Sequence, residues 1–362
     1  MSTNINTEKH RESAVYRLKK LYESFGYSQY KMSKFEEYDL YVRNKSFLVS
    51  DHIITFTDTD GSLMALKPDV TLSIVKNSRE KESGVRKVYY NENVYRVPRG
   101  ALSFKEIMQA GLECIGELDT YSVAEVLSLA AKSLELISPD YVLDVSHMGI
   151  ISALVDEIGL SARGRTQLLS CIGEKNAHGI DAVCTDEGID KSRVETLKKL
   201  IAMKGDSSEM LDVLKDSTCY SEVQELAEII DILSAQGRRV RVDFSVTDDM
   251  KYYSGVVFKG FIKGIPTSVL SGGRYDNLMR KMGKQSGAIG FAVYLDLLGE
   301  LEENVNEYDT DVLVLYGDET EVKAICRLTE ELTAAGKRVI VKKSIPEKLK
   351  YRELIDLTGE GR

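Results

Sequence analysis

Apolar side chains recur every three or four positions in the first part of the chain, which is the period of an α-helix with one buried face. This pattern covers residues 8–25 and predicts an amphipathic helix that ends at Gly26. The same period returns over residues 121–137 and predicts a second helix, ended by Ser138-Pro139.

Between these two helices the pattern changes to short runs rich in β-forming residues. Residues 53–56 and 63–66 flank a polar segment that contains a glycine, which predicts a β-hairpin. Residues 87–91 form a further predicted strand, which pairs either with residues 94–96 or with a later strand near residues 104–112. Strands joined by such short connections must be antiparallel.

The middle of the chain differs from both flanks. Residues 148–236 show amphipathic helical patches and few β-rich runs, which predicts a helical insertion. Strands are then expected at residues 240–245, 252–258, 267–270 and 290–294, the last followed by a short helix. Hairpins with interleaved helices indicate an α+β fold with a mostly antiparallel sheet.

The end of the chain has the pattern of a small α/β unit. Residues 311–316 form a nearly continuous apolar strand, residues 319–335 a helix and residues 338–341 another strand. This order predicts one βαβ unit and leaves room for a final helix. We therefore expect a core over residues 1–304, which includes the helical insertion, and a small α/β segment over residues 308–362.

Composition narrows the class of protein. With 362 residues, 43% of them hydrophobic, the chain can form one large core and a smaller unit. Its net charge of −9 argues against a broad nucleic-acid surface, because phosphate binding depends on clustered lysine and arginine. Its five cysteines are scattered without a Cys-x-x-Cys pair, so we expect a reducing cytosol and no metal site. No apolar run approaches the roughly 18 residues of a membrane span, so we expect a cytoplasmic protein.

The first candidate site is the segment Lys67-Pro68-Asp69-Val70-Thr71, which follows the predicted hairpin. Asp69 and Thr71 project from one loop, so together they can hold an ammonium group through one charged and one neutral hydrogen bond. Alternatively, one of them caps the helix that begins near Leu72. Taken alone, the cap is the commoner role for Asp and Thr at such a position.

The second candidate is the strand that contains Gln109, Gly111 and Glu113. These residues share one face because side chains alternate along a strand, and the glycine leaves room above the sheet. Gln109 can donate and accept hydrogen bonds, and Glu113 can accept one from an N–H group, so this face can form the floor of a site for a small polar ligand. The alternative is that both side chains face solvent.

The third candidate combines Tyr252-Tyr253-Ser254-Gly255 with Ser271-Gly272-Gly273-Arg274-Tyr275-Asp276. The first piece offers two phenols beside a glycine that permits close approach of the backbone. The second piece predicts a glycine-rich turn that leads into a helix. Each piece alone is weak evidence, since tyrosine pairs usually pack in cores and glycine pairs usually mark turns.

Taken in order, these segments resemble the catalytic core of histidyl-tRNA synthetase, a class II aminoacyl-tRNA synthetase, over most of residues 10–300. The matching segments are Leu66-Lys67-Pro68-Asp69-Val70-Thr71, Arg96, Gln109-Ala110-Gly111-Leu112-Glu113, Tyr252-Tyr253-Ser254-Gly255 and Ser271-Gly272-Gly273-Arg274-Tyr275-Asp276. The resemblance implies a class II synthetase-like antiparallel sheet with flanking helices.

The resemblance also implies a pocket for free histidine. Asp69, Thr71 and Gln109 would face the α-amino group of the ligand, and Arg96 its carboxylate. Glu113 and Tyr252 would face the imidazole, and Tyr253 is a further candidate beside them.

The departures from the family's pattern fall mainly on the nucleotide side. Asp248 and Leu297 stand where the family has arginines that serve adenylation, and Tyr294 replaces a small glycine that makes room for adenine. Ser33 replaces a motif proline, and Pro98 stands where a glutamate is expected. Adenylation depends on preorganised cations. At about 4 kcal/mol per unit charge, the change from arginine to Asp248 alone would slow the reaction by several orders of magnitude.

A synthetase-like chain that has a histidine pocket but lacks the arginines for adenylation resembles the regulatory subunit of ATP phosphoribosyltransferase. That enzyme catalyses the first step of histidine biosynthesis. The Pro68-Asp69-Val70-Thr71 form of the loop favours this family over the synthetase. The resemblance implies a noncatalytic chain without a cofactor, required for activity and for feedback inhibition by free L-histidine. It further implies self-association as a dimer and assembly with a short-form catalytic subunit into a hetero-octamer.

Two other functions stay open at this point. A divergent ligase that adenylates histidine would need another cation in place of the missing arginines. A tRNA-binding paralogue of the synthetase is the third possibility, but the acidic charge argues against it. Residues 308–362 resemble only the start of an anticodon-binding domain, so we do not expect tRNA binding.

Overall fold

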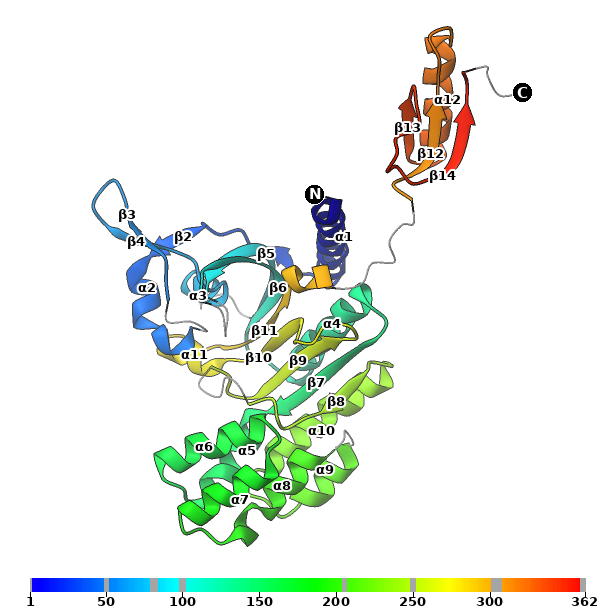
Figure 1. Ribbon diagram of the computed structural model, residues 1–362. Coiled ribbons are helices and arrows are strands. Elements are labelled where there is room, and N and C mark those ends of the chain that lie inside the picture. Colours follow the sequence, from blue (N-terminus) through cyan, green and yellow to red (C-terminus); the bar gives the residue numbers. More distant parts are fainter. Residues whose placement is uncertain are drawn as a thin grey trace. The chain divides into compact units, whose positions relative to one another are not determined.

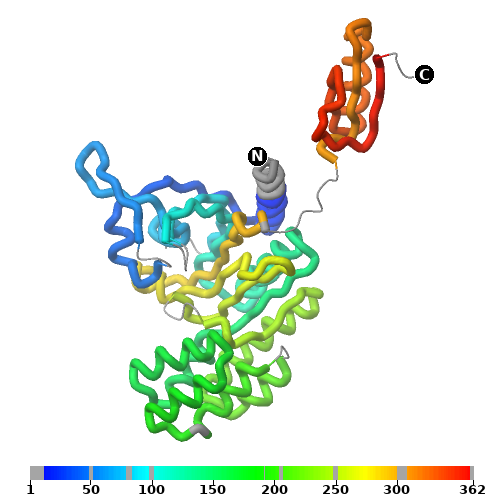
Figure 2. The backbone as a smooth tube through the Cα atoms, viewed as in Figure 1, coloured from blue at the N-terminus to red at the C-terminus, as the bar shows by residue number. Residues whose placement is uncertain are grey.

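The computed structural model describes residues 2–48, 52–78, 84–97, 102–203, 207–247, 252–300 and 308–358. The chain forms two compact units, Met1–Glu300 and Leu301–Arg362. Figure 2 traces the backbone, coloured along the sequence from blue to red.

The first unit is built on an eight-stranded sheet with the order β1-β5-β6-β11-β10-β9-β7-β8 (Figure 1). Its strands are β1 Ser28–Gln29, β5 Val85–Arg96, β6 Lys105–Gly116, β7 Tyr141–His147, β8 Val240–Val242, β9 Val256–Ile262, β10 Leu270–Arg274 and β11 Gly287–Tyr294. Only the outer pairs β1–β5 and β7–β8 are parallel. The predicted α+β fold with a mostly antiparallel sheet is therefore confirmed.

Of the two pairings expected for residues 87–91, the one with the later strand near residues 104–112 is confirmed, since β5 pairs along its whole length with β6. The run near Val94 is the end of β5 and not a separate strand. The predicted glycine-rich turn is wrong. Gly272 and Gly273 lie within β10 and not in a turn. A Cβ on Gly272 would lie 2.4 Å from the Gly290 carbonyl oxygen, and one on Gly273 would lie 2.7 Å from the Tyr253 ring. These glycines therefore permit close packing on the sheet and do not serve chain reversal.

A small second sheet of the first unit has the order β2-β4-β3. Strands β3 (Thr55–Thr57) and β4 (Leu63–Leu66) form the predicted hairpin, and β2 (Phe35–Glu37) pairs with the other edge of β4. The turn of the hairpin needs a glycine because Gly61 has a φ of +88°. Helix α2 (Tyr38–Arg43) and the 3₁₀ turn η1 (Lys45–Phe47) follow β2.

Two helices cover one face of the main sheet. They are α1 (Ser2–Ser24) and α4 (Thr120–Ile137), and α4 is confirmed close to its predicted bounds. The hydroxyls of Tyr22 and Ser133 lie 3.0 Å apart and join the two helices, while the Tyr22 ring meets Phe291 of β11 edge-on. Because side chains alternate along a strand, the odd-numbered residues of β6 point to the opposite face.

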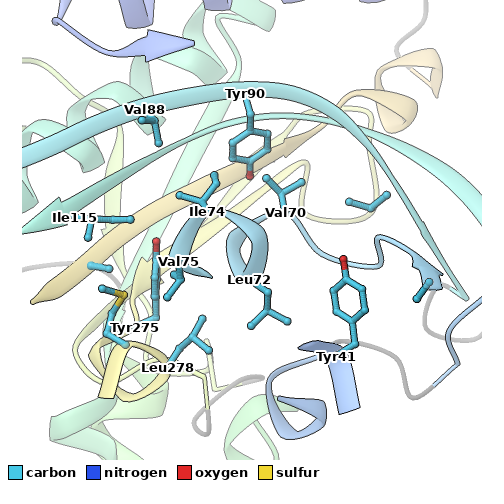
Figure 3. Packing of buried hydrophobic residues seen from close by; sticks show 14 residues of the cluster. Tyr41, Val70, Leu72, Ile74, Val75, Val88, Tyr90, Ile115, Tyr275 and Leu278 are labelled. Carbon is cyan, nitrogen blue, oxygen red and sulfur yellow. The ribbon is translucent and has the colours of Figure 1, made fainter. Parts of the chain in front are cut away.

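Helices α3 (Thr71–Lys76) and α11 (Asp276–Lys281) lie on that opposite face. Figure 3 shows Leu72, Ile74 and Val75 of α3 packed among side chains from other elements, including Tyr90 and Leu278. Leu72, Ile74 and Val75 are fully buried. This core holds α3, and the loop before it, against the sheet.

The helices expected over residues 148–236 are present, and Figure 1 shows them gathered together in green. They are α5 Met148–Ile158, α6 Ala162–Gly173, α7 Ala177–Asp186, η2 Lys191–Val194, α8 Glu195–Ala202, α9 Ser207–Leu214 and α10 Tyr220–Ala235. Helix α10 packs against α4, β7 and β8, which joins this helical region to the sheet. The 3₁₀ turn η3 (Leu295–Glu300) follows β11, as the expected short helix.

The second unit is a three-stranded parallel sheet with one helix. Strands β12 (Thr310–Leu315) and β13 (Val339–Lys342) flank α12 (Val322–Ala334), so the predicted βαβ unit is confirmed. The expected final helix is wrong, because residues 351–356 form strand β14. β14 pairs with the edge of β12 that β13 leaves open, and so satisfies its backbone hydrogen bonds. No helix in the described ranges of the chain is long and apolar enough to cross a membrane.

Candidate functional site

A polar pocket lies on the face of the main sheet opposite α1 and α4. All seven residues predicted for the histidine site line it: Asp69, Thr71, Arg96, Gln109, Glu113, Tyr252 and Tyr253. They come from the loop before α3, from β5 and β6, and from the segment before β9. About 80 Å³ inside is open to the centres of water molecules, enough for several waters or a small ligand.

The Asp69 loop serves two roles at once. One carboxylate oxygen of Asp69 accepts a 2.8 Å hydrogen bond from the Leu72 N–H group at the start of α3, which is the predicted helix cap. The same side chain lines the pocket. Burial raises the pKa of Asp69, and the nearby Arg96 guanidinium opposes this shift. The cap therefore fixes the carboxylate at the pocket wall.

The floor of the pocket is the odd-numbered face of β6. Gln109 and Glu113 are 5% and 2% exposed, so the alternative that they face solvent is wrong. They are covered because α3 and the segment before β9 lie over this face. A Cβ at Gly290, the partner of Glu113 on β11, would lie 1.8 Å from a Glu113 carboxylate oxygen. Gly290 is thus required for Glu113 to lie flat across the sheet.

Glu113 accepts two hydrogen bonds from the pocket wall. The Thr71 hydroxyl donates to one oxygen over 2.9 Å, and the Tyr275 hydroxyl donates to the other over 2.5 Å. Burial raises the pKa of Glu113 to about 8, because the two hydrogen bonds offset only part of the desolvation. Without a ligand this carboxyl group is therefore largely protonated at neutral pH.

Aromatic rings form the roof. The ring of Tyr252 meets those of Tyr253, Phe47 and Tyr275, with centroids 4.8 Å, 6.0 Å and 5.7 Å away. Burial raises the pKa values of Tyr252 and Tyr275 well above 10, so both hydroxyls stay protonated and can donate. The pocket thus combines flat apolar surfaces with hydrogen-bonding groups, which suits a planar polar ring.

Sequence reasoning missed several residues that line the pocket: Phe47, Tyr90, Ser271, Tyr275 and Ala292. Tyr275 stood in a matched motif but was given no role. Placing Gly273 in a strand would have put Tyr275 on the same face by the period of two. Phe47 comes from a 3₁₀ turn far away in sequence, and no local pattern marks it.

The residues that depart from the synthetase pattern do not all line the pocket. Tyr294 lines the pocket, and its hydroxyl lies 2.6 Å from that of Ser271. Leu297 lies half-buried in η3, and Ser33 is exposed. Asp248 and Pro98 lie outside the described residues. Among the residues that the structure describes, no cluster of three or more His, Cys, Asp or Glu side chains is arranged to hold a metal ion.

The antiparallel sheet, with two helices on one face and a polar pocket on the other, defines the class II aminoacyl-tRNA synthetase fold. The family model of histidyl-tRNA synthetase matches residues 5–298. The chain therefore belongs to the histidyl-tRNA synthetase family.

The chain is similar to curated sequences and to solved structures. An ATP phosphoribosyltransferase regulatory subunit from Caldanaerobacter subterraneus subsp. tengcongensis is 29% identical over 85% of this chain and 84% of its own length. A crystal structure of an ATP phosphoribosyltransferase regulatory subunit/histidyl-tRNA synthetase from Bacillus halodurans has a TM-score of 0.78, with 23% identity over 97% of this chain and 95% of that one. A chain of the ATP phosphoribosyl transferase (HisG:HisZ) complex from Thermotoga maritima has a TM-score of 0.63, with 18% identity over 78% of this chain and 96% of that one.

Proposed function

We propose that this chain is the noncatalytic regulatory subunit of ATP phosphoribosyltransferase, in the first step of histidine biosynthesis. Several relatives, from Clostridium kluyveri among others, are named as that subunit. The observation that carries the proposal is that the site keeps residues suited to an amino acid and lacks residues that serve the nucleotide. The groups suited to an amino acid line one pocket, whereas Asp248, Tyr294 and Leu297 replace residues that serve the nucleotide in the synthetase.

In this proposal the pocket binds free L-histidine as the effector. Asp69, Thr71 and Gln109 hold the α-amino group, and Arg96 holds the carboxylate. Charged and neutral donors and acceptors thereby pair with both ends of a zwitterion.

The imidazole lies at the other end of the ligand, against Glu113, Tyr252 and Tyr253. A carboxylate that is costly to ionise in the empty pocket gains a partner when an imidazole N–H approaches it.

The chain itself catalyses no reaction in this proposal. Adenylation collects negative charge on a triphosphate, and its rate depends on cations placed to meet that charge. Arg96 is one cation of the pocket, but the two further arginines of the synthetase pattern are absent from the sequence at positions 248 and 297. The chain then only binds histidine, and this binding regulates a partner subunit.

The partner is the short-form catalytic subunit, in a cytoplasmic hetero-octamer that contains dimers of this chain. Residues 1–304 serve as the synthetase-like core, with the helical insertion at about 148–236. Residues 308–362 resemble the start of an anticodon-binding domain. The net charge of −9 does not favour tRNA as a ligand.

Reconstitution tests this function directly. Mixing the purified chain with a short-form catalytic subunit should start phosphoribosyl-ATP formation, and L-histidine should then inhibit it. The catalytic subunit alone and this chain alone are the controls. Absence of activation would contradict the proposal, and histidine-dependent exchange of pyrophosphate into ATP by this chain alone would show a ligase instead.

A further inference from the structure

The pocket floor is made of three rungs that run across β6 and β11. Glu113 faces Gly290 in the first rung, Gly111 faces Ala292 in the second, and Gln109 faces Tyr294 in the third. Residues on one face of a strand repeat about every 6.8 Å, so the first and third rungs are about 14 Å apart. The middle rung carries only the small residues Gly111 and Ala292, whereas Glu113 stands in one end rung and Gln109 and Tyr294 form the other.

Tyr294 closes one end of this floor. Its hydroxyl reaches back to the Ser271 hydroxyl of β10, 2.6 Å away, and Ser271 is itself the partner of Ala292 in the middle rung. Such diagonal contacts between neighbouring strands are within reach of aromatic side chains. The phenol of Tyr294 is thereby held along the pocket wall instead of being free to swing out to solvent.

The charges indicate which end of an amino acid meets Tyr294. Arg96 is the one cation among the described residues that line the pocket. It lies at the end of β5 beyond the third rung, because Glu92 pairs with Gln109 and Arg96 pairs with Lys105. The carboxylate of a bound amino acid is therefore expected at the Tyr294 end, and its side chain at the Glu113 end.

We infer that Tyr294, held by Ser271, is a specificity-determining residue that limits the pocket to amino acids with a free, unextended carboxylate. Derivatives of the bound amino acid that are extended through its carboxyl group, such as peptides, clash with the Tyr294 phenol and are excluded. This inference rests on the proposed binding of L-histidine and adds the class of ligand that the pocket rejects.

The test is calorimetric titration of the full chain with L-histidine, L-histidyl-glycine and glycyl-L-histidine. The wild type should bind L-histidine at least 100-fold more tightly than L-histidyl-glycine. Tyr294→Ala should bind L-histidyl-glycine at least tenfold more tightly than the wild type does, and its preference for L-histidine over this peptide should be smaller. Glycyl-L-histidine keeps a free carboxylate and is lengthened at the amino end, so Tyr294→Ala should improve its binding less than that of L-histidyl-glycine.

Tyr294→Phe is the matched control, because it keeps the ring and removes only the hydroxyl. It loses the bond to Ser271 but keeps the bulk of the ring, so it should gain less affinity for L-histidyl-glycine than Tyr294→Ala does. Tyr294→Val, a good strand former, takes the place of Tyr294→Ala if circular dichroism shows that the alanine variant does not fold.

Three results would overturn the inference alone: equal L-histidyl-glycine affinities in wild type and Tyr294→Ala, equal gains in Tyr294→Ala and Tyr294→Phe, or an equal gain for glycyl-L-histidine. A folded wild type that binds no L-histidine would overturn both the inference and the proposed effector. Activation of the catalytic subunit is measured without histidine, so the regulatory function can survive that result.

Discussion

The chemistry of single residues in this pocket is governed by burial. Glu113 is 2% exposed and accepts its two hydrogen bonds from neutral hydroxyls, and no ion pair to it is found within the described ranges of the chain. Its pKa is therefore raised to about 8, whereas an unfolded chain has an ordinary glutamate. A raised carboxyl pKa means that the folded state binds a proton that the unfolded state has already released. Stability should therefore fall as the pH rises from about 4.5 to about 8.

Glu113→Gln should remove this part of the pH dependence. The amide cannot ionise, so the variant's free energy of unfolding should change less between pH 5 and pH 8 than that of the wild type. The difference should be on the order of a few kcal/mol, since each pKa unit corresponds to about 1.4 kcal/mol. Urea unfolding at the two pH values measures it. Glu117→Gln, at an exposed position just beyond β6, is the control and should follow the wild type. Parallel losses in Glu113→Gln and the wild type would contradict the assignment.

Most site residues could be predicted because they stand in short segments with their own chemistry. Gln109 and Glu113 share a strand face by the period of two, and Asp69 stands at the start of a helix. Tyr90 could not be found in this way. It reaches the pocket only because Gly111 on the next strand lacks a side chain, and a Cβ there would lie 2.5 Å from the Tyr90 hydroxyl. Such a contact depends on register, which local sequence does not fix.

At the scale of the elements, helix α5 is capped by His147, a titratable residue at the end of β7. The Nδ1 atom of His147 accepts a 3.1 Å hydrogen bond from the Gly149 N–H group. Burial lowers the pKa of His147 to about 4, with Glu222 opposing this shift and Arg274 adding to it. A protonated imidazole cannot accept the bond, so the cap exists only in the neutral form.

Acid should therefore destabilise the start of the helical region. The unfolded chain binds a proton at His147 near pH 6.5 and the folded chain only near pH 4, so stability is lost as the pH falls between these values. His147→Asn keeps a capping acceptor without titrating, and should lose less stability than the wild type over this range. Thermal unfolding at pH 6.5 and pH 4.5 measures the effect. His178→Asn, at an exposed position of α7, should behave as the wild type, and equal slopes in all three proteins would rule out this role for His147.

Elements with a strong period were predicted well, and elements defined by pairing were not. Helix α4 shows an apolar stripe and a polar cap at Asp119, whose carboxylate accepts from the Ser122 N–H group, and so is visible in the sequence. The sequence left room for a final helix where strand β14 lies. This segment becomes a strand because the edge of β12 is open to it. Partner strands distant in sequence decide such cases.

At the scale of the whole molecule, the proposed function requires that histidine binding and activation of the partner be separable. The pocket lies on one face of the main sheet and is lined by buried and half-buried side chains, so a change at a buried position such as Gln109 leaves the outer surface of the chain intact. Any coupling to the catalytic subunit is a free energy shared by two binding events, and it is therefore reciprocal. The catalytic subunit must change the affinity of this chain for histidine by the same factor as histidine changes its affinity for the catalytic subunit.

Gln109→Leu should uncouple feedback inhibition from activation in the reconstituted complex. Leucine keeps much of the bulk of the side chain but lacks the carbonyl and NH2 of the amide, so the proposed contact with the α-amino group is lost, at about 1–3 kcal/mol. Activity without histidine should stay within twofold of the wild-type complex, while the histidine concentration for half inhibition should rise about tenfold or more. Glu117→Gln, exposed and outside the pocket, should change neither value. If Gln109→Leu is inhibited at the wild-type concentration, histidine acts at another site in the complex. If it fails to activate at all while remaining folded, the pocket is part of the activating contact and the two functions are not separable.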